Sequence, residues 1–249
     1  MSFVGYGEPP QFFTFGSLDA LGLPHATTTR HCPGVGAGSE SSGPFRPEAG
    51  RALAGAGLDL GRVAWARQVH EAEAVRVTPA GGFAGTGDVL VSAEPGVALS
   101  IFTADCLAIV LYDAEARAVA VAHVGWRGTV RGAAQAAVTA LTGLGARPER
   151  LRAAIAPSIG PCCYEIDAPV AAEFRRAYPA LWEAWVTPVR ADHWLLDLWR
   201  ANETLLARSG VPPAQIDNPR VCTACHPELF YSYRKGNRGR LVTLAALPR

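Results

Sequence analysis

Residues 103–128, TADCLAIVLYDAEARAVAVAHVGWRG, determine most of what this chain's sequence predicts. Two apolar runs rich in Leu, Ile, Val and Ala are separated by the polar segment Asp113–Arg117. A short polar connection between two such runs predicts a β-hairpin. Cys106 begins the first run and His123 ends the second. The open end of the hairpin would therefore place this thiol beside this imidazole.

A cysteine and a histidine side by side favour two kinds of chemistry. They can be ligands of a metal ion, or a nucleophilic thiol and the base that activates it. A third residue bears on the choice, because His70 ends another predicted strand, residues 62–70 (RVAWARQVH). Two imidazoles and one thiolate would make a three-ligand zinc site with an open fourth position, the pattern of catalytic zinc sites. The spacing of the three residues leaves both possibilities open.

Composition excludes several other classes of protein. The chain has 249 residues, of which 49% are hydrophobic, enough for a substantial core in one large domain or two small ones. The net charge of +1 gives no global field that would attract nucleic acid or a membrane surface. No run of apolar residues is long enough to span a bilayer, and residues 1–15 lack the pattern of a secretion signal. We therefore expect a cytoplasmic protein with neither nucleic acid nor membrane as a partner.

The six cysteines are better explained as thiols and metal ligands than as disulfides, because the chain is large and shows no secretion signal. His31 and Cys32 are interpreted as an exposed pair in a loop. Cys162 and Cys163 are adjacent, and adjacent side chains on an extended chain point in opposite directions, so they are not expected to bind one metal ion. The segment 221–226 (VCTACH) contains the haem-attachment pattern CxxCH, but haem attachment occurs in exported proteins. A structural zinc would need two more nearby ligands, and no second CxxC supplies them, so 221–226 is predicted to be a strand with partly buried thiols.

Helices are predicted over 129–144, over 168–188 with a break at Pro179, and over 194–206, from apolar residues at helical spacing. Arg127 lies just before the first of these helices and Arg131 in its first turn. Because a helix N-terminus presents free N–H groups, these arginines are candidates for binding phosphate or carboxylate. Ordinary solvent-facing arginines explain the pattern equally well.

Several motifs together carry a resemblance to a known family. RQVH, TADC, HVGWRG, GPCCYEI, a CT…FYSYR segment and a terminal GR occur in order within residues 62–245, with a weaker start at TTTR, residues 27–30. In this combination they closely resemble the YfiH-type family, also called the polyphenol oxidoreductase (laccase) or purine nucleoside phosphorylase family. The resemblance implies a single α/β domain over residues 1–249, with mixed β-sheets sandwiched by helices.

The resemblance also implies a site and a set of activities. Zinc would be held by His70, Cys106 and His123. The expected reactions are phosphorolysis of adenosine, inosine, guanosine and methylthioadenosine, and deamination of adenosine, so the partners are purine nucleosides and phosphate. Copper-dependent oxidation of phenols has also been ascribed to the family. Arg127 is the candidate for charge stabilisation, and Asp105 or Asp88 for a hydrogen bond to a ligand histidine.

The sequence departs from the family pattern between residues 31 and 50, which are shorter and read HCPGVGAGSESSGPFRPEAG, so the resemblance does not extend to substrate contacts from this loop. Val124 replaces the more usual alanine of HAGWRG, whereas GTGD leads to Asp88 as in the family.

Three other functions remain open besides that of a zinc-dependent nucleoside enzyme. They are a metal-free amide or peptide hydrolase that uses Cys106 and His123, a copper-dependent phenol oxidase, and a zinc-stabilised binding module without activity. Six histidines in all do not easily supply the many ligands of multi-copper oxygen reduction. The sequence does not indicate an oligomeric state.

Overall fold

The predicted hairpin forms the centre of the molecule. A computed structural model describes residues 2–36 and 43–249. In it, β9 (Leu107–Asp113) pairs antiparallel with β10 (Ala118–Val124) along their whole length, and every residue of both strands is buried. Alternate side chains of β9 face opposite ways: Leu107, Ile109 and Leu111 join one apolar cluster, and Ala108, Val110 and Tyr112 another. Both faces of the hairpin are therefore covered, as its nearly continuous apolar sequence requires.

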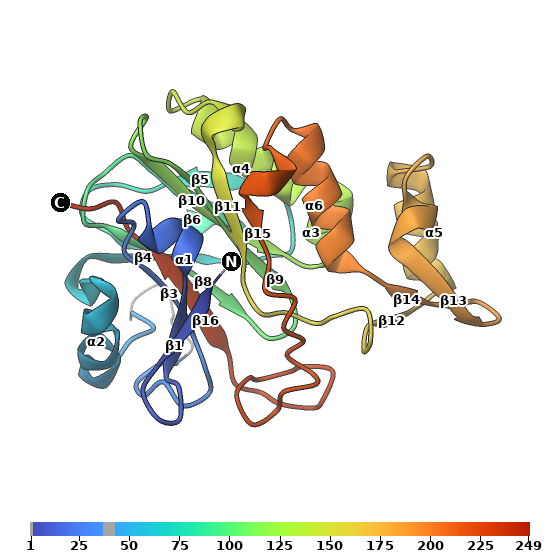
Figure 1. Ribbon diagram of the computed structural model, residues 1–249, viewed down its shortest axis with the longest axis horizontal. Coiled ribbons are helices and arrows are strands. Elements are labelled where there is room, and N and C mark those ends of the chain that lie inside the picture. Colours follow the sequence, from blue (N-terminus) through green and yellow to red (C-terminus); the bar gives the residue numbers. More distant parts are fainter. Residues whose placement is uncertain (1, 37–42) are drawn as a thin grey trace.

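Two mixed sheets pack face to face, and the hairpin forms the middle of one of them (Figure 1). The six-stranded sheet has the order β15 (Ile216–Asp217), β11 (Arg152–Ile155), β9, β10, β7 (Val89–Ser92), β5 (Ala74–Arg76). The seven-stranded sheet has the order β1 (Phe3–Tyr6), β2 (Phe12–Phe15), β3 (His25–Thr28), β16 (Leu241–Ala245), β8 (Ala98–Thr103), β4 (Val63–Arg67), β6 (Gly82–Thr86). Each sheet combines parallel and antiparallel pairs; for example, β4 is parallel to β8 whereas β16 is antiparallel to it.

Helices cover the outer faces of the two sheets. α4 (Ala133–Thr142) and α6 (Leu198–Arg208) pack on the six-stranded sheet through an apolar cluster that includes Ala137, Leu141 and Leu205. α2 (Pro47–Leu53) lies on the far side of the seven-stranded sheet (Figure 1), where Leu53 packs with Val242 and Leu244. α1 (Gly16–Asp19) follows β2, and α3 (Trp126–Arg131) follows β10. The expected α/β class, with mixed sheets sandwiched by helices, is confirmed.

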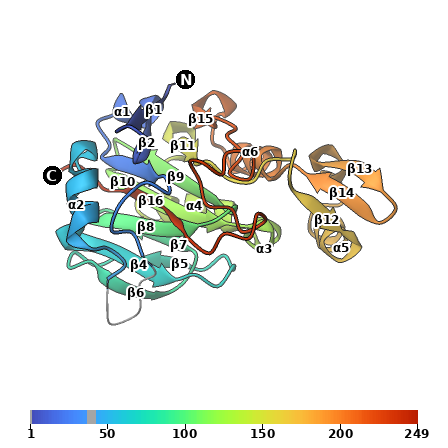
Figure 2. The ribbon, with the colours of Figure 1, turned by 90° about the horizontal axis from the view of Figure 1, so that it is seen from below.

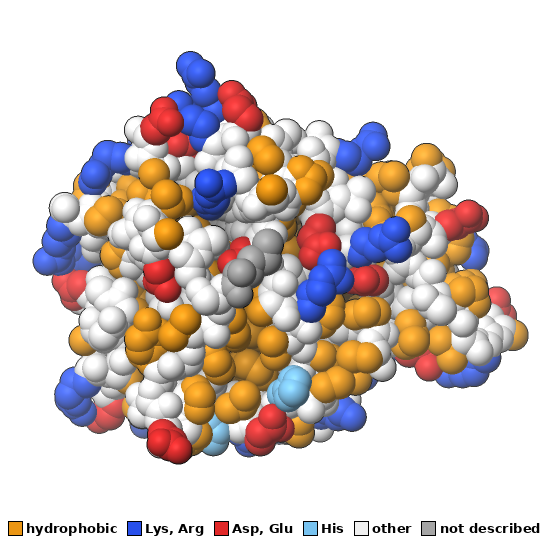
Figure 3. All heavy atoms as spheres, in the orientation of Figure 1, with side chains coloured by type: hydrophobic (Ala, Val, Ile, Leu, Met, Phe, Trp, Pro, Cys, Tyr) orange, Lys and Arg blue, Asp and Glu red, His pale blue; other side chains and the backbone are white. Residues whose placement is uncertain are grey.

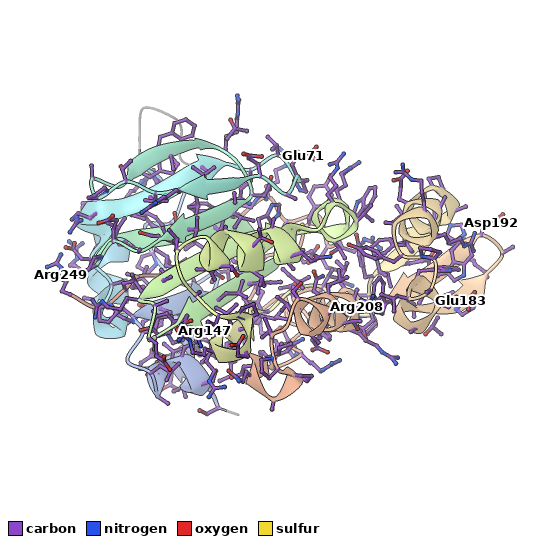
Figure 4. All side chains as sticks on the ribbon, turned by 90° about the horizontal axis from the view of Figure 1, so that it is seen from above. Glu71, Arg147, Glu183, Asp192, Arg208 and Arg249 are labelled. Atoms are coloured by element: carbon purple, nitrogen blue, oxygen red, sulfur yellow. The ribbon has the colours of Figure 1, made fainter. Side chains whose placement is uncertain are left out.

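A smaller lobe projects from one end of the sheets (Figure 2). It consists of the antiparallel sheet β12 (Glu165–Asp167), β14 (His193–Leu196), β13 (Val186–Arg190), together with α5 (Ala168–Ala177). In Figure 4, Asp192 and Glu183 lie in this lobe, and Arg249 lies at the opposite end of the molecule. Short 3-10 turns complete the chain: Ala54–Ala56, Leu60–Arg62, Pro148–Arg150, Trp182–Trp185 and Pro213–Gln215. The extension of one domain over residues 1–249 stays a prediction.

Several local predictions are wrong. The helix expected over 129–144 is two helices, α3 and α4, which meet at Gly132 with a φ of 82°. The helix expected from residue 194 begins only at Leu198, because residues 193–196 form the central strand of the lobe. The strand expected over 221–226 is a turn, which forms an isolated β-bridge between Cys222 and Ser158 of the loop after β11. The first error reflects the positive φ of Gly132, and the other two arose where contacts with distant segments decide the local structure.

The surface agrees with the near-neutral composition. Figure 3 shows acidic and basic side chains interspersed with apolar ones on the face in view. Within residues 2–36 and 43–249, no helix is long and apolar enough to cross a membrane.

Candidate metal centre and adjoining cavities

The structure brings together three residues that lie far apart in the sequence. The ligand atoms of His70, Cys106 and His123 all lie within 4.8 Å of one another. His123 is in β10 and Cys106 immediately precedes β9, so the open end of the hairpin brings these two together as its pairing predicts. His70 comes from the loop after β4, and its ring meets the His123 ring edge to face, with 4.7 Å between centroids.

Asp88 fixes the relative position of the two histidines. Its fully buried carboxylate accepts a hydrogen bond from Nδ1–H of His123 at 2.7 Å. The same carboxylate accepts the backbone N–H groups of Val69, His70 and Glu71 at 2.9–3.1 Å. With Nδ1 of His123 bound in this way, Nε2 is the nitrogen left for a metal ion or for Cys106. Of the two acids considered from the sequence, Asp88 is the one that contacts a histidine of this centre.

Asp105, which the sequence made a candidate for a hydrogen bond to a ligand histidine, bonds instead to residues near the C-terminus. Its carboxylate accepts hydrogen bonds from Thr223 Oγ1 at 2.6 Å, Ser232 Oγ at 3.0 Å and the Arg234 backbone N–H at 2.7 Å. Its backbone has a φ of 84°, a left-handed conformation that is uncommon for a residue with a side chain. Asp105 therefore ties the turn that carries Cys106 to two distant C-terminal segments.

The loop that carries His70 is also held from several sides. His70 has a φ of 62°, so it too adopts the left-handed conformation. The Gln68 side chain makes two hydrogen bonds of 2.8 Å with the backbone of Phe102. Arg131 donates to the His70 carbonyl at 2.9 Å and pairs with Glu71 at 2.8 Å, and Figure 4 shows Glu71 near α3. Of the two arginines considered from the sequence, Arg131 is thus engaged with the loop, and Arg127 is the one that lies beside the centre.

The surroundings of Cys106 and His123 shift the pKa of each side chain toward its charged form. Burial would raise the pKa of the Cys106 thiol, but hydrogen bonds and opposite charge from His123 and His70 lower it to about 6. Burial would lower the pKa of His123, but its hydrogen bonds to Asp88 and Cys106 raise it to about 9. Without a metal ion, these shifts favour a thiolate on Cys106 beside an imidazolium on His123.

The donor set suits a transition metal. Zinc bonds of roughly 2.0–2.3 Å to nitrogen and sulfur place tetrahedral ligands about 3.3–3.8 Å apart, and the three ligand atoms here lie within 4.8 Å of one another. Asp88 and the hairpin cover one side of the centre, at Cys106 and His123, whereas His70 on the other side is exposed. Three protein ligands on one side and access on the other match the open pattern of a catalytic site.

Two cavities meet at this centre. One, of about 280 Å³, is lined by Tyr164, Trp126, Leu198 and Arg234; the other, of about 630 Å³, is lined by Gln68, Phe102 and Arg240. His70, Cys106, Arg127 and Tyr233 border both. Tyr233 is 74% exposed, and the Arg127 guanidinium lies 4.4 Å from the centroid of the Trp126 ring. Apolar and aromatic walls with a few cationic groups are typical of a small-molecule site.

Some lining residues could not be identified from the sequence. Two of them, Arg234 and Arg240, come from the C-terminal segment 230–240. Tyr164 follows the Cys162–Cys163 pair, and nothing in its local pattern indicates a cavity.

His31 is exposed as expected, but Cys32 is buried in the cluster around Leu53. Part of the divergent 31–50 loop, residues 37–42, lies outside the described residues.

Known proteins with similar sequences and structures all belong to the same group of relatives but carry different names. Residues 47–248 match the family described as multi-copper polyphenol oxidoreductase laccase. A protein of Deinococcus radiodurans named purine nucleoside phosphorylase is 40% identical over 92% of this chain and 91% of its own length. Adenosine deaminase RL5, from an unknown prokaryotic organism, is 38% identical over 63% of this chain and 60% of its own. The crystal structure of the hypothetical protein YfiH of Bacillus licheniformis superimposes with a TM-score of 0.85 and 25% identity, covering 96% of this chain and 97% of that one.

Proposed function

Because this chain belongs to the multi-copper polyphenol oxidoreductase laccase family, many of whose relatives are named purine nucleoside phosphorylase, we propose that it is a zinc-dependent purine nucleoside phosphorylase. The proposed substrates are adenosine, inosine, guanosine and methylthioadenosine, with adenosine deamination as a second reaction. The observation that carries the proposal is the convergence of His70, Cys106 and His123 at the junction of two cavities that Arg127 also borders.

His70, Cys106 and His123 would hold the zinc ion. When bound, the ion would act as a Lewis acid that orients phosphate or lowers the pKa of water. Asp88 keeps His123 oriented through the 2.7 Å hydrogen bond to Nδ1, so that this imidazole does not turn away from the site. The negative charge of the Cys106 thiolate reduces the electrophilicity of the site, which predicts a modest catalyst.

The cavities supply substrate binding. Trp126, Tyr164 and Tyr233 provide aromatic surface on which a purine base can stack. Burial and the neighbouring Cys106 raise the pKa of Tyr164, so its hydroxyl stays protonated and able to donate a hydrogen bond. The Arg127 guanidinium supplies positive charge for the phosphate that attacks the ribose anomeric carbon. In that reaction the bond from ribose to the base breaks, and the base leaves with a proton.

A product-resolved assay tests the proposal. Purified protein is incubated with adenosine and phosphate, with and without a chelator, and adenine, inosine and hypoxanthine are separated by chromatography. We expect chelator-sensitive adenine or inosine from the wild type and from Cys32→Ala, a cysteine variant in a separate apolar cluster, but none from Cys106→Ala. No product from zinc-loaded wild type would contradict the nucleoside reaction.

A second function is supported by a separate observation. The lowered pKa of Cys106, about 6, and the raised pKa of His123, about 9, describe the thiolate–imidazolium pair that a cysteine hydrolase uses. A metal-free amide or peptide hydrolase would keep its activity in chelator and lose it on alkylation of Cys106. The nucleoside enzyme would lose its activity in chelator.

A copper-dependent phenol oxidase and an inactive binding module have less support. Outside the centre, His25 is buried and hydrogen-bonded to Phe15 and Leu23, and His31, His193 and His226 belong to neither group of potential metal ligands in the described chain. The multi-copper reduction of oxygen needs more imidazole ligands than this arrangement supplies. A zinc-stabilised binding module would have no turnover in the assay above.

A further inference from the structure

A second cluster of potential metal ligands lies outside the candidate centre. The sulfur atoms of Cys162, Cys163, Cys222 and Cys225 all lie within 4.8 Å of one another. Cys225 Sγ is 3.5 Å from Cys162 Sγ and 3.5 Å from Cys163 Sγ. The expectation that the adjacent cysteines point in opposite directions is therefore wrong. Cys162 and Cys163 lie in a turn, in which the N–H groups of Cys163 and Tyr164 both donate to the Gly160 carbonyl.

The spacing of the four sulfur atoms fits a tetrahedral ion. With zinc–sulfur bonds of about 2.3 Å, the sulfur atoms of a tetrahedral site lie about 3.8 Å apart. The two distances of 3.5 Å and the limit of 4.8 Å bracket that value. Four thiolates without an open position form the closed type of site that stabilises structure. All four cysteines are free thiols here, and one disulfide bond would use only two of them.

The backbone around the cluster is arranged for close approach. The Gly160 N–H donates to Cys222 Sγ at 3.2 Å, the kind of hydrogen bond that stabilises a metal-bound thiolate. A Cβ atom at Gly160 would lie 2.5 Å from the Trp199 ring and 3.2 Å from Cys222 Cβ, so only glycine fits between them. Trp199 also anchors the loop by donating its indole N–H to Ser158 Oγ at 2.7 Å.

We propose that Cys162, Cys163, Cys222 and Cys225 bind one structural zinc ion, separate from the His70–Cys106–His123 centre. Binding joins the loop after β11 to the turn at 222–225, and each thiol that binds the ion releases its proton to water. The loop continues into Tyr164, and the Cys163 carbonyl accepts a hydrogen bond from Arg234, so the ion supports the wall of the smaller cavity. This proposal does not rest on the proposed function.

The test measures the number of zinc ions bound per chain by elemental mass spectrometry. The protein is purified under reducing, oxygen-free conditions. The samples are the wild type, Cys106→Ser, the double variant Cys162→Ser/Cys225→Ser, and Cys32→Ala as the cysteine control. With both sites filled, we expect about two zinc ions in the wild type and in the control, and about one in each of the other two proteins. If the three-ligand centre binds no zinc, the wild type and Cys106→Ser would both hold about one ion and the double variant none.

A second measurement tests the proposal without the double variant, in case that variant does not fold. Cobalt titrated into metal-free Cys106→Ser should give the intense visible bands and thiolate-to-cobalt charge transfer of a four-sulfur site, because Cys106 no longer contributes a sulfur ligand. Absence of both zinc and these bands in Cys106→Ser would overturn the proposal. So would zinc content that is the same in the double variant as in the wild type, or a disulfide among the four cysteines in the reduced protein.

Discussion

At the scale of single residues, Asp88 explains how a loop and a strand form one centre. Burial would raise the pKa of its carboxyl, but the hydrogen bond with His123 and those with the Glu71 and Val69 backbone lower it. The group is thus an anion in a fully buried position, compensated by four N–H donors. Removing its charge affects His123 and the His70 loop together.

Asp88→Asn should weaken zinc binding at the three-ligand centre by about 10- to 100-fold, the usual cost of losing the partner of a ligand histidine. The amide is uncharged and has only one oxygen for the four donors. Competition with a chromogenic chelator measures the affinity, and Asp192→Asn, in an exposed turn of the lobe, is the control. Equal affinities in Asp88→Asn and the wild type would contradict the role given to Asp88.

Gly125 tests how closely the centre is packed. A Cβ atom there would lie 2.8 Å from Cys106 Sγ and 3.6 Å from His70 Cδ2. Gly125→Ala should therefore displace the thiolate and lower metal affinity and turnover by roughly 10-fold or more, with the fold retained. Gly50→Ala, whose new methyl group meets no atom within 4 Å, is the matched control. A Gly125→Ala protein with wild-type metal affinity would show that the centre tolerates this displacement.

The sequence predicted which residues form this centre better than how they are held. His70, Cys106 and His123 were marked by their positions at strand ends and by the family motifs. The sequence could not decide between Asp88 and Asp105, because the choice depends on which carboxylate the fold places against the His123 ring. Asp105 also bonds to Thr223, Ser232 and Arg234, more than a hundred residues away, and no local pattern shows such contacts.

At the scale of elements, prediction succeeded where local periodicity decides the structure. The β9–β10 hairpin has alternating apolar faces and a polar turn, and it formed as expected. Helix 129–144 was predicted without its break, since an isolated glycine in a helical pattern does not reveal whether its φ is positive. Residues 193–196 became a strand because they pair with β12 and β13, a tertiary constraint that overrides helical spacing.

The hairpin turn provides a test of stability. The buried Asp113 carboxylate accepts hydrogen bonds from the Arg150 guanidinium and from the backbone N–H groups of Glu115, Ala116 and Arg147. Asp113→Asn should lower the free energy of unfolding by roughly 1–3 kcal/mol near neutral pH, because it removes a charged acceptor shared by several donors. Urea unfolding measures the difference, with Asp192→Asn as the exposed control.

The pH dependence of that difference follows from the pKa of Asp113. Burial would raise this pKa, but the backbone hydrogen bonds and Arg150 lower it below its usual value of about 3.9. A lowered pKa in the folded state means that the stabilisation is complete above the unfolded-state pKa and is lost as pH falls through the folded-state pKa. The wild type should therefore lose its advantage over Asp113→Asn below about pH 4. An advantage that grows in acid would contradict the assignment.

At the scale of the whole molecule, the two sheets bring distant segments to one place. The loop after β4, the open end of the hairpin and residues 230–240 reach the same pair of cavities. Within the family, relatives carry the names purine nucleoside phosphorylase and adenosine deaminase, and the family description names a laccase. A shared fold thus accompanies different named reactions, and the residues around the centre must distinguish them.

The most direct test of the account is to remove the metal and restore it. Formation of adenine and ribose 1-phosphate from adenosine and phosphate is measured in wild-type protein as purified, after chelation, and after zinc is added back, with circular dichroism confirming the fold at each stage. The account predicts a loss of roughly 100-fold or more after chelation and recovery with zinc. A folded, metal-free protein that turns adenosine over at the original rate would contradict it.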